Sequence, residues 1–182
     1  VYILGQKREQ NGTRPIPQEG FQRALVLEGV SFAYENVDVL RNITLTLNKG
    51  EMIALVGRSG AGKSTLVDLL LRFYEPDSGT FTLDGMPVTE FKLTDYRRMF
   101  GVVSQENILF NDTVYSNIAY ARPWLTEEQV RHAAQVANAE PFILNDLEDG
   151  YQTMLGERGA RLSGGQRQRI AIARAIAPHP QI

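Results

Sequence analysis

Residues 57–65 match the phosphate-loop pattern G-x-x-x-x-G-K-[ST] at every fixed position. An apolar run of strand length, 51–56, precedes this loop, and a helix-forming run without Gly or Pro, 66–73, follows it. The loop is therefore predicted to connect a strand to a helix. In that context inward-facing amides and the helix N-terminus bind phosphate groups, so the sequence predicts a nucleotide site.

The polar side chains of the loop have separate predicted roles. Lys63 reaches the β- and γ-phosphates, the Ser64 hydroxyl binds Mg²⁺, and Thr65 bonds an oxygen of the α-phosphate. The other candidate nucleotide-binding residues contribute backbone amides: Gly57, Arg58, Ser59, Gly60, Ala61 and Gly62. The alternative is a glycine-rich turn that carries a lysine by chance, and the strand and helix flanks argue against it.

Composition limits the remaining classes of function. The chain has 182 residues, enough for one domain or for one domain with an inserted lobe. The net charge of −2 lacks the basic excess that is typical of nucleic-acid-binding proteins, so no nucleic-acid partner is expected. The absence of Cys excludes disulfides and thiolate metal sites. Its apolar runs are too short to span a bilayer, so the chain itself is expected to be soluble.

Polar and glycine-rich or proline-rich sequence at the start predicts a linker or extended arm over residues 1–20. Strands are predicted from β-branched, aromatic or alternating runs at 24–34, 43–47, 80–83 and 100–104. A turn at 48–50 is expected to lead into the 51–56 strand. Another tight turn is expected at 84–85.

The later part of the chain is predicted to be mainly helical. Helices are predicted at 94–99 with Thr94 as N-cap, at 114–121 capped by Asp112, at 126–139, and at 167–177. Ser163 is placed to cap the last helix, and Pro178 ends it.

Residues 162–166 hold a second motif in which two glycines stand before a helix. Its candidate ligand-binding residues are Ser163, Gly164, Gly165 and Gln166. Backbone donors and the helix dipole make this a second predicted anion site. Taken alone, the motif is weak and fits an ordinary capped helix better than an anion site.

Together these motifs resemble the nucleotide-binding domain of ATP-binding-cassette (ABC) proteins. The loop at 57–65 is similar to Walker A and residues 162–166 to the family signature. Gln105 resembles the Q-loop glutamine, which in the family completes the Mg²⁺ shell and senses the γ-phosphate, and Tyr34 resembles the aromatic residue that stacks on adenine. The alternatives are a solvated loop amide for Gln105 and a core aromatic for Tyr34.

The resemblance implies an α/β P-loop NTPase core with an antiparallel β subdomain and an inserted α-helical lobe. The cassette is expected over 21–182, with the helical subdomain at about 106–177. The implied cofactors are ATP and Mg²⁺, and Lys63 and Gln105 are the implied catalytic residues. A second nucleotide-binding domain packs head to tail, so that Lys63, Ser64 and Gln105 act in cis while Ser163, Gly164 and Gly165 act in trans.

Two stretches, 105–110 and 156–159, resemble the exporter type of cassette. This resemblance implies a transmembrane domain upstream, which the 156–159 stretch contacts at the cytoplasmic face of the cell membrane. Met154 departs from the acidic residue of the family pattern, which puts coupling there in doubt. Glu157 and Arg158 could instead form a surface ion pair.

The resemblance stops at 178–182, before the Walker B Asp, the catalytic Glu and the switch His of the family. Neither His132 nor His179 matches the switch His. We therefore expect C-terminal strands to be missing, the 51–56 and 100–104 segments to lack partners, and this chain to bind nucleotide weakly without turnover. The alternatives are a non-transporter ABC ATPase, a P-loop kinase or GTPase outside the family, and an interaction fragment.

Overall fold

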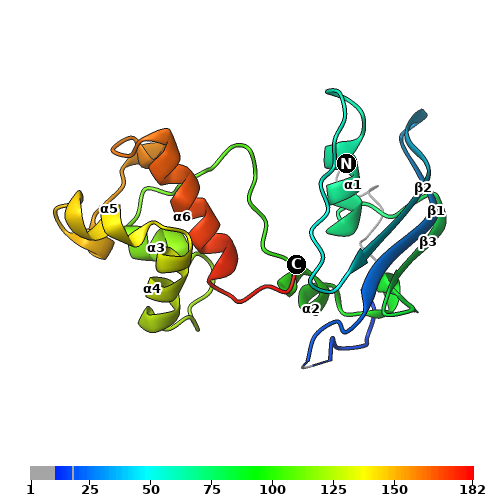
Figure 1. Ribbon diagram of the computed structural model, residues 1–182, viewed down its shortest axis with the longest axis horizontal. Helices are drawn as coiled ribbons and strands as arrows, with labels where there is room; N and C mark the ends of the chain where they lie inside the picture. The colour runs from blue at the N-terminus through cyan, green and yellow to red at the C-terminus, as the bar shows by residue number, and fades with distance from the viewer. Residues whose placement is uncertain (1–10, 18) are drawn as a thin grey trace, which may run out of the picture. The chain divides into compact units, whose positions relative to one another are not determined.

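The computed structural model describes residues 11–17 and 19–182. These fall into two compact units, one ending at Met99 and one starting at Phe100. The first holds a sheet with strand order β2-β1-β3-β4, and the second is helical (Figure 1). Of the predicted linker, residues 1–10 and 18 lie outside the described part. No described helix combines the length and the apolar character needed to cross a bilayer.

The sheet is antiparallel throughout, and β1 lies between β2 and β3 (Figure 1). Its strands are β1 (Ala24–Tyr34), β2 (Val37–Asn48), β3 (Ser78–Leu83) and β4 (Met86–Pro87). Alternate β1 residues such as Leu25 and Leu27 are buried, as expected for a strand with one face on a core. The strands predicted at 24–34 and 80–83 are confirmed. The β2 strand begins earlier than predicted because Val37 pairs with Tyr34 across a short turn.

The strands predicted at 51–56 and 100–104 are wrong. Neither segment forms a strand or pairs with one among the described residues. The side chains of Met52 and Val56 are 95% and 93% exposed. A strand needs a neighbour to satisfy its amides and carbonyls, so an apolar run alone does not make one. The turn at 48–50 accordingly ends β2 without starting a hairpin.

The phosphate-loop helix is α1 (Lys63–Leu70), which starts three residues before the predicted run. It ends in a left-handed turn at Arg72, whose φ is 55°. The amide of Arg72 donates to the Leu69 carbonyl and that of Phe73 to the Asp68 carbonyl, each at 2.9 Å. This is the Schellman pattern of helix termination, which normally has glycine at the left-handed position.

Helix α2 (Leu93–Arg98) follows a 3₁₀ turn, η2 (Val88–Glu90). The prediction of Thr94 as its N-cap is wrong, because the N-cap is Lys92, which makes no side-chain cap. Instead the Leu93 amide donates to Oδ1 of Asn11 at 3.0 Å. A side chain 82 residues away in the sequence thus caps the start of α2.

In the second unit α6 packs against α3 and α4, and α5 packs against α4 (Figure 1). Its helices are α3 (Val114–Ile118), α4 (Glu127–Val136), α5 (Glu140–Asn145) and α6 (Gly164–Ile176), with 3₁₀ turns η3 (Gly150–Gln152) and η4 (Glu157–Gly159). The cap predicted at Ser163 is confirmed as a full capping box, and Thr126, where a helix was predicted to begin, forms another. The Asp112 cap is wrong: Thr113 caps α3 by accepting from the Ser116 amide.

Apolar side chains from these helices and from the segments between them form one buried cluster, which includes Val114, Ile118, Val130, Ile143, Leu155, Leu162 and Ile170. Leu162 is 4% exposed and stands directly before Ser163. Packing of Leu162 therefore holds the start of α6 at the surface of the second unit.

Candidate nucleotide-binding site

Gly62 sets the geometry of the phosphate loop. It occupies the N-cap position of α1 with φ of 82°, a left-handed conformation that suits glycine. A Cβ at this position would lie 2.7 Å from Cδ2 of Leu40 and 3.2 Å from the Val39 carbonyl oxygen. Strand β2 therefore supports the loop from behind. The motif pattern requires Gly62, but nothing in the local sequence indicates Val39 and Leu40 as its support.

The Lys63 side chain folds back over its own loop. Its Nζ donates to the carbonyl oxygens of Gly57 at 2.9 Å and Arg58 at 2.8 Å. These bonds close a ring over residues 57–63 and hold the loop in a tight curve. An ammonium group has three donors, so one remains for an anion after these two bonds.

Backbone amides at the start of α1 point ahead of the helix. The Leu66 amide closes the first turn by donating to the Gly62 carbonyl at 2.8 Å. The amides of Lys63 and Ser64 precede it, where a helix has no internal acceptor to offer. The following loop residues are exposed: Gly57, Arg58, Ser59, Gly60, Ala61 and Ser64. Thr65 is buried, at 8% exposure.

Tyr34 lies at the end of β1 and is 37% exposed, so it is not a core aromatic residue. Its ring makes edge contacts with Phe32 at 4.9 Å and Tyr74 at 5.2 Å between ring centroids. Both contacts are perpendicular, and the residue stays partly open to solvent.

The 162–166 motif forms the N-terminus of α6. The Ser163 side chain accepts from the Gln166 amide, and Oε1 of Gln166 accepts from the Ser163 amide at 2.9 Å. Gln166 is thus engaged in the cap itself. Gly164 and Gly165 are exposed in the first turn, where helix amides lack internal acceptors and the dipole favours an anion.

Gln105 belongs to the second unit, together with the 162–166 motif, whereas the phosphate loop belongs to the first. Within the second unit a hollow of about 390 Å³ is lined by Ser104, Gln105, Asn107, Gly164, Arg167 and Gln168. The structure therefore brings Gln105 and Gly164 of one chain to the same hollow.

A buried polar cluster holds the segment that follows Gln105. Asn117 is fully buried, and its side chain exchanges hydrogen bonds with the backbone of Phe110 at 2.9 and 3.0 Å. The guanidinium of Arg174 donates to Oδ1 of Asn117 at 2.9 Å and to the Ile108 carbonyl at 2.8 Å.

Burial lowers the pKa of Arg174 below its ordinary value. Its guanidinium also lies over the stacked rings of Phe110 and Tyr120. Arg174 was not among the predicted site residues, because a single Arg in a helix carries no signal of these contacts. Through Arg174, α6 is tied to the Gln105 segment.

The 156–159 stretch forms the short turn η4 at the surface. Glu157 is exposed and, with Ile108 and Arg167, lines a second hollow of about 740 Å³. The side chain of Arg158 lies outside the described part, so the alternative of an ion pair with Glu157 stays a prediction. Met154 is 47% exposed and pairs with Thr113 through an antiparallel bridge.

Comparison with known proteins supports one family. A family model described as "ABC transporter" matches residues 40–182. The "ATP-dependent lipid A-core flippase" of Syntrophus aciditrophicus is 49% identical over 156 residues, which are 86% of this chain and 26% of that protein. The "Heterocyst differentiation ATP-binding protein HepA" of Nostoc sp. is 48% identical over 166 residues, which are 90% of this chain and 27% of that protein.

A solved structure described as a "bacterial Atm1-family ABC exporter with ATP bound" is also similar, with a TM-score of 0.87 and 37% identity. The match covers 98% of this chain and 32% of that one. The chain thus spans between a quarter and a third of the length of these proteins.

Proposed function

Since this chain is a member of the ABC transporter family, we propose that it is the ATP-binding part of an exporter, which couples ATP binding and hydrolysis to movement of a substrate across a membrane. The observation that carries this proposal is the Walker A loop, with Lys63 bonded across it and Gly62 placed against β2. Relatives described as a lipid flippase and as an exporter support the transport role. The family match disfavours the alternatives outside the ABC class.

In this proposal the exposed amides at the start of α1 receive the phosphate groups, and the remaining Lys63 donor contacts the β- and γ-phosphates. Tyr34 stacks on the adenine. The donor set also suits Mg²⁺, a hard cation that prefers oxygen ligands: the Ser64 hydroxyl is exposed beside the amides, and Gln105 offers an amide oxygen. When bound, Mg²⁺ would be held by Ser64 and Gln105 and would supply positive charge beside the phosphate groups.

The proposal extends to the partners of the chain. A transmembrane domain precedes this chain, and the chain lies at the cytoplasmic face of the membrane. Glu157 in η4 is exposed and is a candidate contact for that domain. A second nucleotide-binding domain packs head to tail, and Ser163, Gly164 and Gly165 at the start of α6 donate to the γ-phosphate of the ATP held by its Walker A loop. The exposure of these three residues supports such an intermolecular role.

Nucleotide titration of the 182-residue chain tests the proposal. Lys63→Ala is expected to weaken binding of ATP with Mg²⁺ at least about tenfold, because it removes a charge-assisted contact to phosphate. Lys49→Ala, an exposed lysine in the turn after β2, is the matched control and is expected to have no effect. If the two variants bind ATP equally well, the assignment of the Walker A loop is wrong.

We further propose that this chain binds ATP without multiple turnover, because it carries no residue in the role of the Walker B Asp or the catalytic Glu. A phosphate-release assay on the purified chain is expected to show no steady rate. Steady release that Lys63→Ala abolishes would contradict this.

A further inference from the structure

Residues 11–14 of the N-terminal arm lie along the segment 90–93 in the manner of a short extra strand. The Arg14 amide donates to the Glu90 carbonyl at 3.0 Å, and the Lys92 amide donates to the Arg14 carbonyl at 2.7 Å. Arg14 and Phe91 form a parallel bridge. The Asn11 side chain accepts from the Leu93 amide at the start of α2. The arm is therefore docked by backbone bonds as well as by a side chain.

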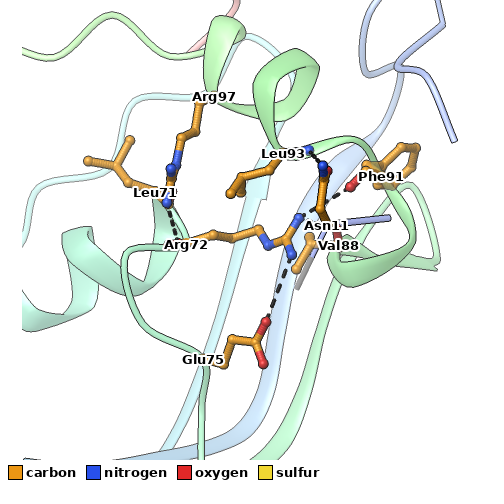
Figure 2. A network of polar contacts seen from close by, with 8 residues as sticks. All are labelled: Asn11, Leu71, Arg72, Glu75, Val88, Phe91, Leu93 and Arg97. Atoms are coloured by element: carbon orange, nitrogen blue, oxygen red, sulfur yellow. Dashed lines mark hydrogen bonds and ion pairs between the residues drawn. The ribbon is translucent and has the colours of Figure 1, made fainter. Parts of the chain in front are cut away.

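The same segment holds the far end of the phosphate-loop helix (Figure 2). Arg72 is 5% exposed, and its guanidinium donates to the Val88 carbonyl at 2.8 Å and the Phe91 carbonyl at 3.4 Å. An ion pair with Glu75 at 3.9 Å adds to these contacts. Arg72 stands in the left-handed position where helix ends favour glycine, so its backbone is held in a costly conformation. The contacts of the guanidinium offset this cost.

Helix α2 also contacts the end of α1. The Arg97 guanidinium donates to the carbonyls of Leu71 at 3.0 Å and Arg72 at 2.6 Å, and the Tyr96 hydroxyl donates to the Leu70 carbonyl at 2.7 Å. Helix α2 thereby satisfies the carbonyl of the last residue of α1 and those of the two residues after it. The first amide of α2 is in turn capped by Asn11. An eight-residue helix is about 12 Å long, so this network and the phosphate loop sit at opposite ends of one short rigid element.

We propose that docking of the arm and binding of nucleotide at the phosphate loop are energetically coupled through α1, with Arg72 as the positioning residue that joins them. This inference rests on the proposed function, since it assigns regulation to the same nucleotide site. Release of the arm frees the Leu93 amide and loosens 88–93, so Arg72 loses fixed acceptors and α1 loses its anchored end. The nucleotide then binds a less ordered helix N-terminus. By linkage, nucleotide strengthens docking of the arm by the same factor.

Gly12 provides a selective test. A Cβ at this position would coincide with the backbone carbonyl group of Glu90, so Gly12→Ala prevents docking without altering any core side chain. Its exposed neighbour gives the matched control, Thr13→Ala. In the full 182-residue chain we expect Gly12→Ala to weaken ATP binding by about fivefold or more and Thr13→Ala to leave it unchanged. Asn11→Ala, which removes one hydrogen bond, is expected to act in the same direction to a smaller extent.

A second readout follows hydrogen exchange at the Leu93 amide. ATP is expected to slow this exchange in the unaltered chain and to have no effect on it in Arg72→Gly, which keeps the left-handed turn but removes the guanidinium. Circular dichroism verifies that each variant is folded. If Gly12→Ala does not fold, Asn11→Ala takes its place as the variant with a weakened arm. Faster Leu93 exchange in Gly12→Ala or Asn11→Ala with unchanged ATP affinity overturns the coupling. If Lys63→Ala loses ATP binding but Gly12→Ala and Asn11→Ala do not, the coupling fails while the proposed function stays intact.

Discussion

Asp84 is the single residue on which the start of β1 depends most. Its carboxylate accepts hydrogen bonds from the amides of Gln22 at 2.6 Å, Arg23 at 2.7 Å and Ala24 at 3.0 Å. Partial burial raises the pKa of Asp84, but these three bonds and the charge of Arg23 outweigh that effect, and the pKa lies below its ordinary value. The carboxylate thus anchors the turn after β3 to the beginning of its neighbour.

Asp84→Asn is expected to lower the free energy of unfolding at pH 7 by about 1–2 kcal/mol, because an amide offers one acceptor oxygen in place of two charged ones. Because its pKa is depressed in the folded state, the Asp84 carboxylate stabilises the fold fully above its unfolded pKa of about 4, and this stabilisation is lost as the pH falls through the folded pKa. The difference in free energy of unfolding between Asp84→Asn and the unaltered chain should therefore shrink in acid.

Urea unfolding at pH 7 and pH 3 measures this difference. Asp38→Asn is the matched control, since Asp38 forms an exposed pair with Arg41 and should change stability little. A loss that is equally large at both pH values would be inconsistent with the proposed role of the Asp84 charge.

At the scale of single elements, helix starts were predicted correctly at the two capping boxes, but not at α3, where Thr113 is the cap in place of the predicted Asp112. Thr126 and Ser163 each bond an amide three residues ahead, and the glutamine there bonds back. All of these atoms lie within one turn, so the sequence pattern contains the whole interaction. The start of α2 was predicted wrongly because its cap, Asn11, comes from the arm.

This contrast yields a paired test on two threonines. Thr126→Ala should cost about 1 kcal/mol of stability, because it leaves the Gln129 amide without its cap. Thr94→Ala, at an exposed position that caps nothing, should change stability by less than about 0.5 kcal/mol. Thermal or urea unfolding of the two variants gives both values. An equal loss in both would restore Thr94 as a cap and contradict the structure.

Across the whole molecule, apolar side chains are divided unevenly between core and surface. Each unit has buried residues of its own, such as Leu25 and Leu69 in the first and Val130 and Ile170 in the second. By contrast, the apolar run 51–56, which was predicted to be a strand without a partner, has mostly exposed residues. An exposed apolar run of this kind is a site for association.

We expect the chain to bind an apolar dye such as anilinonaphthalene sulfonate through this run. The double variant Met52→Lys, Val56→Lys should lower dye fluorescence and self-association, whereas Val136→Lys, at an exposed valine that ends α4, should not. Dye titration and sedimentation measure the two effects. Equal dye binding in all three proteins would show that 51–56 is covered.

The amino-acid sequence alone determined the phosphate loop, the α6 motif and its Ser163 cap, because each depends on atoms a few residues apart. The Lys63 bonds to Gly57 and Arg58 reach at most six positions along the chain and are of this kind. Only the tertiary structure decided that 51–56 and 100–104 do not form strands, what supports Gly62, and how Asn11 and Arg72 meet the segment 88–93. Those outcomes depend on partners distant in the chain, and propensity within a segment cannot specify which partner will be beside it.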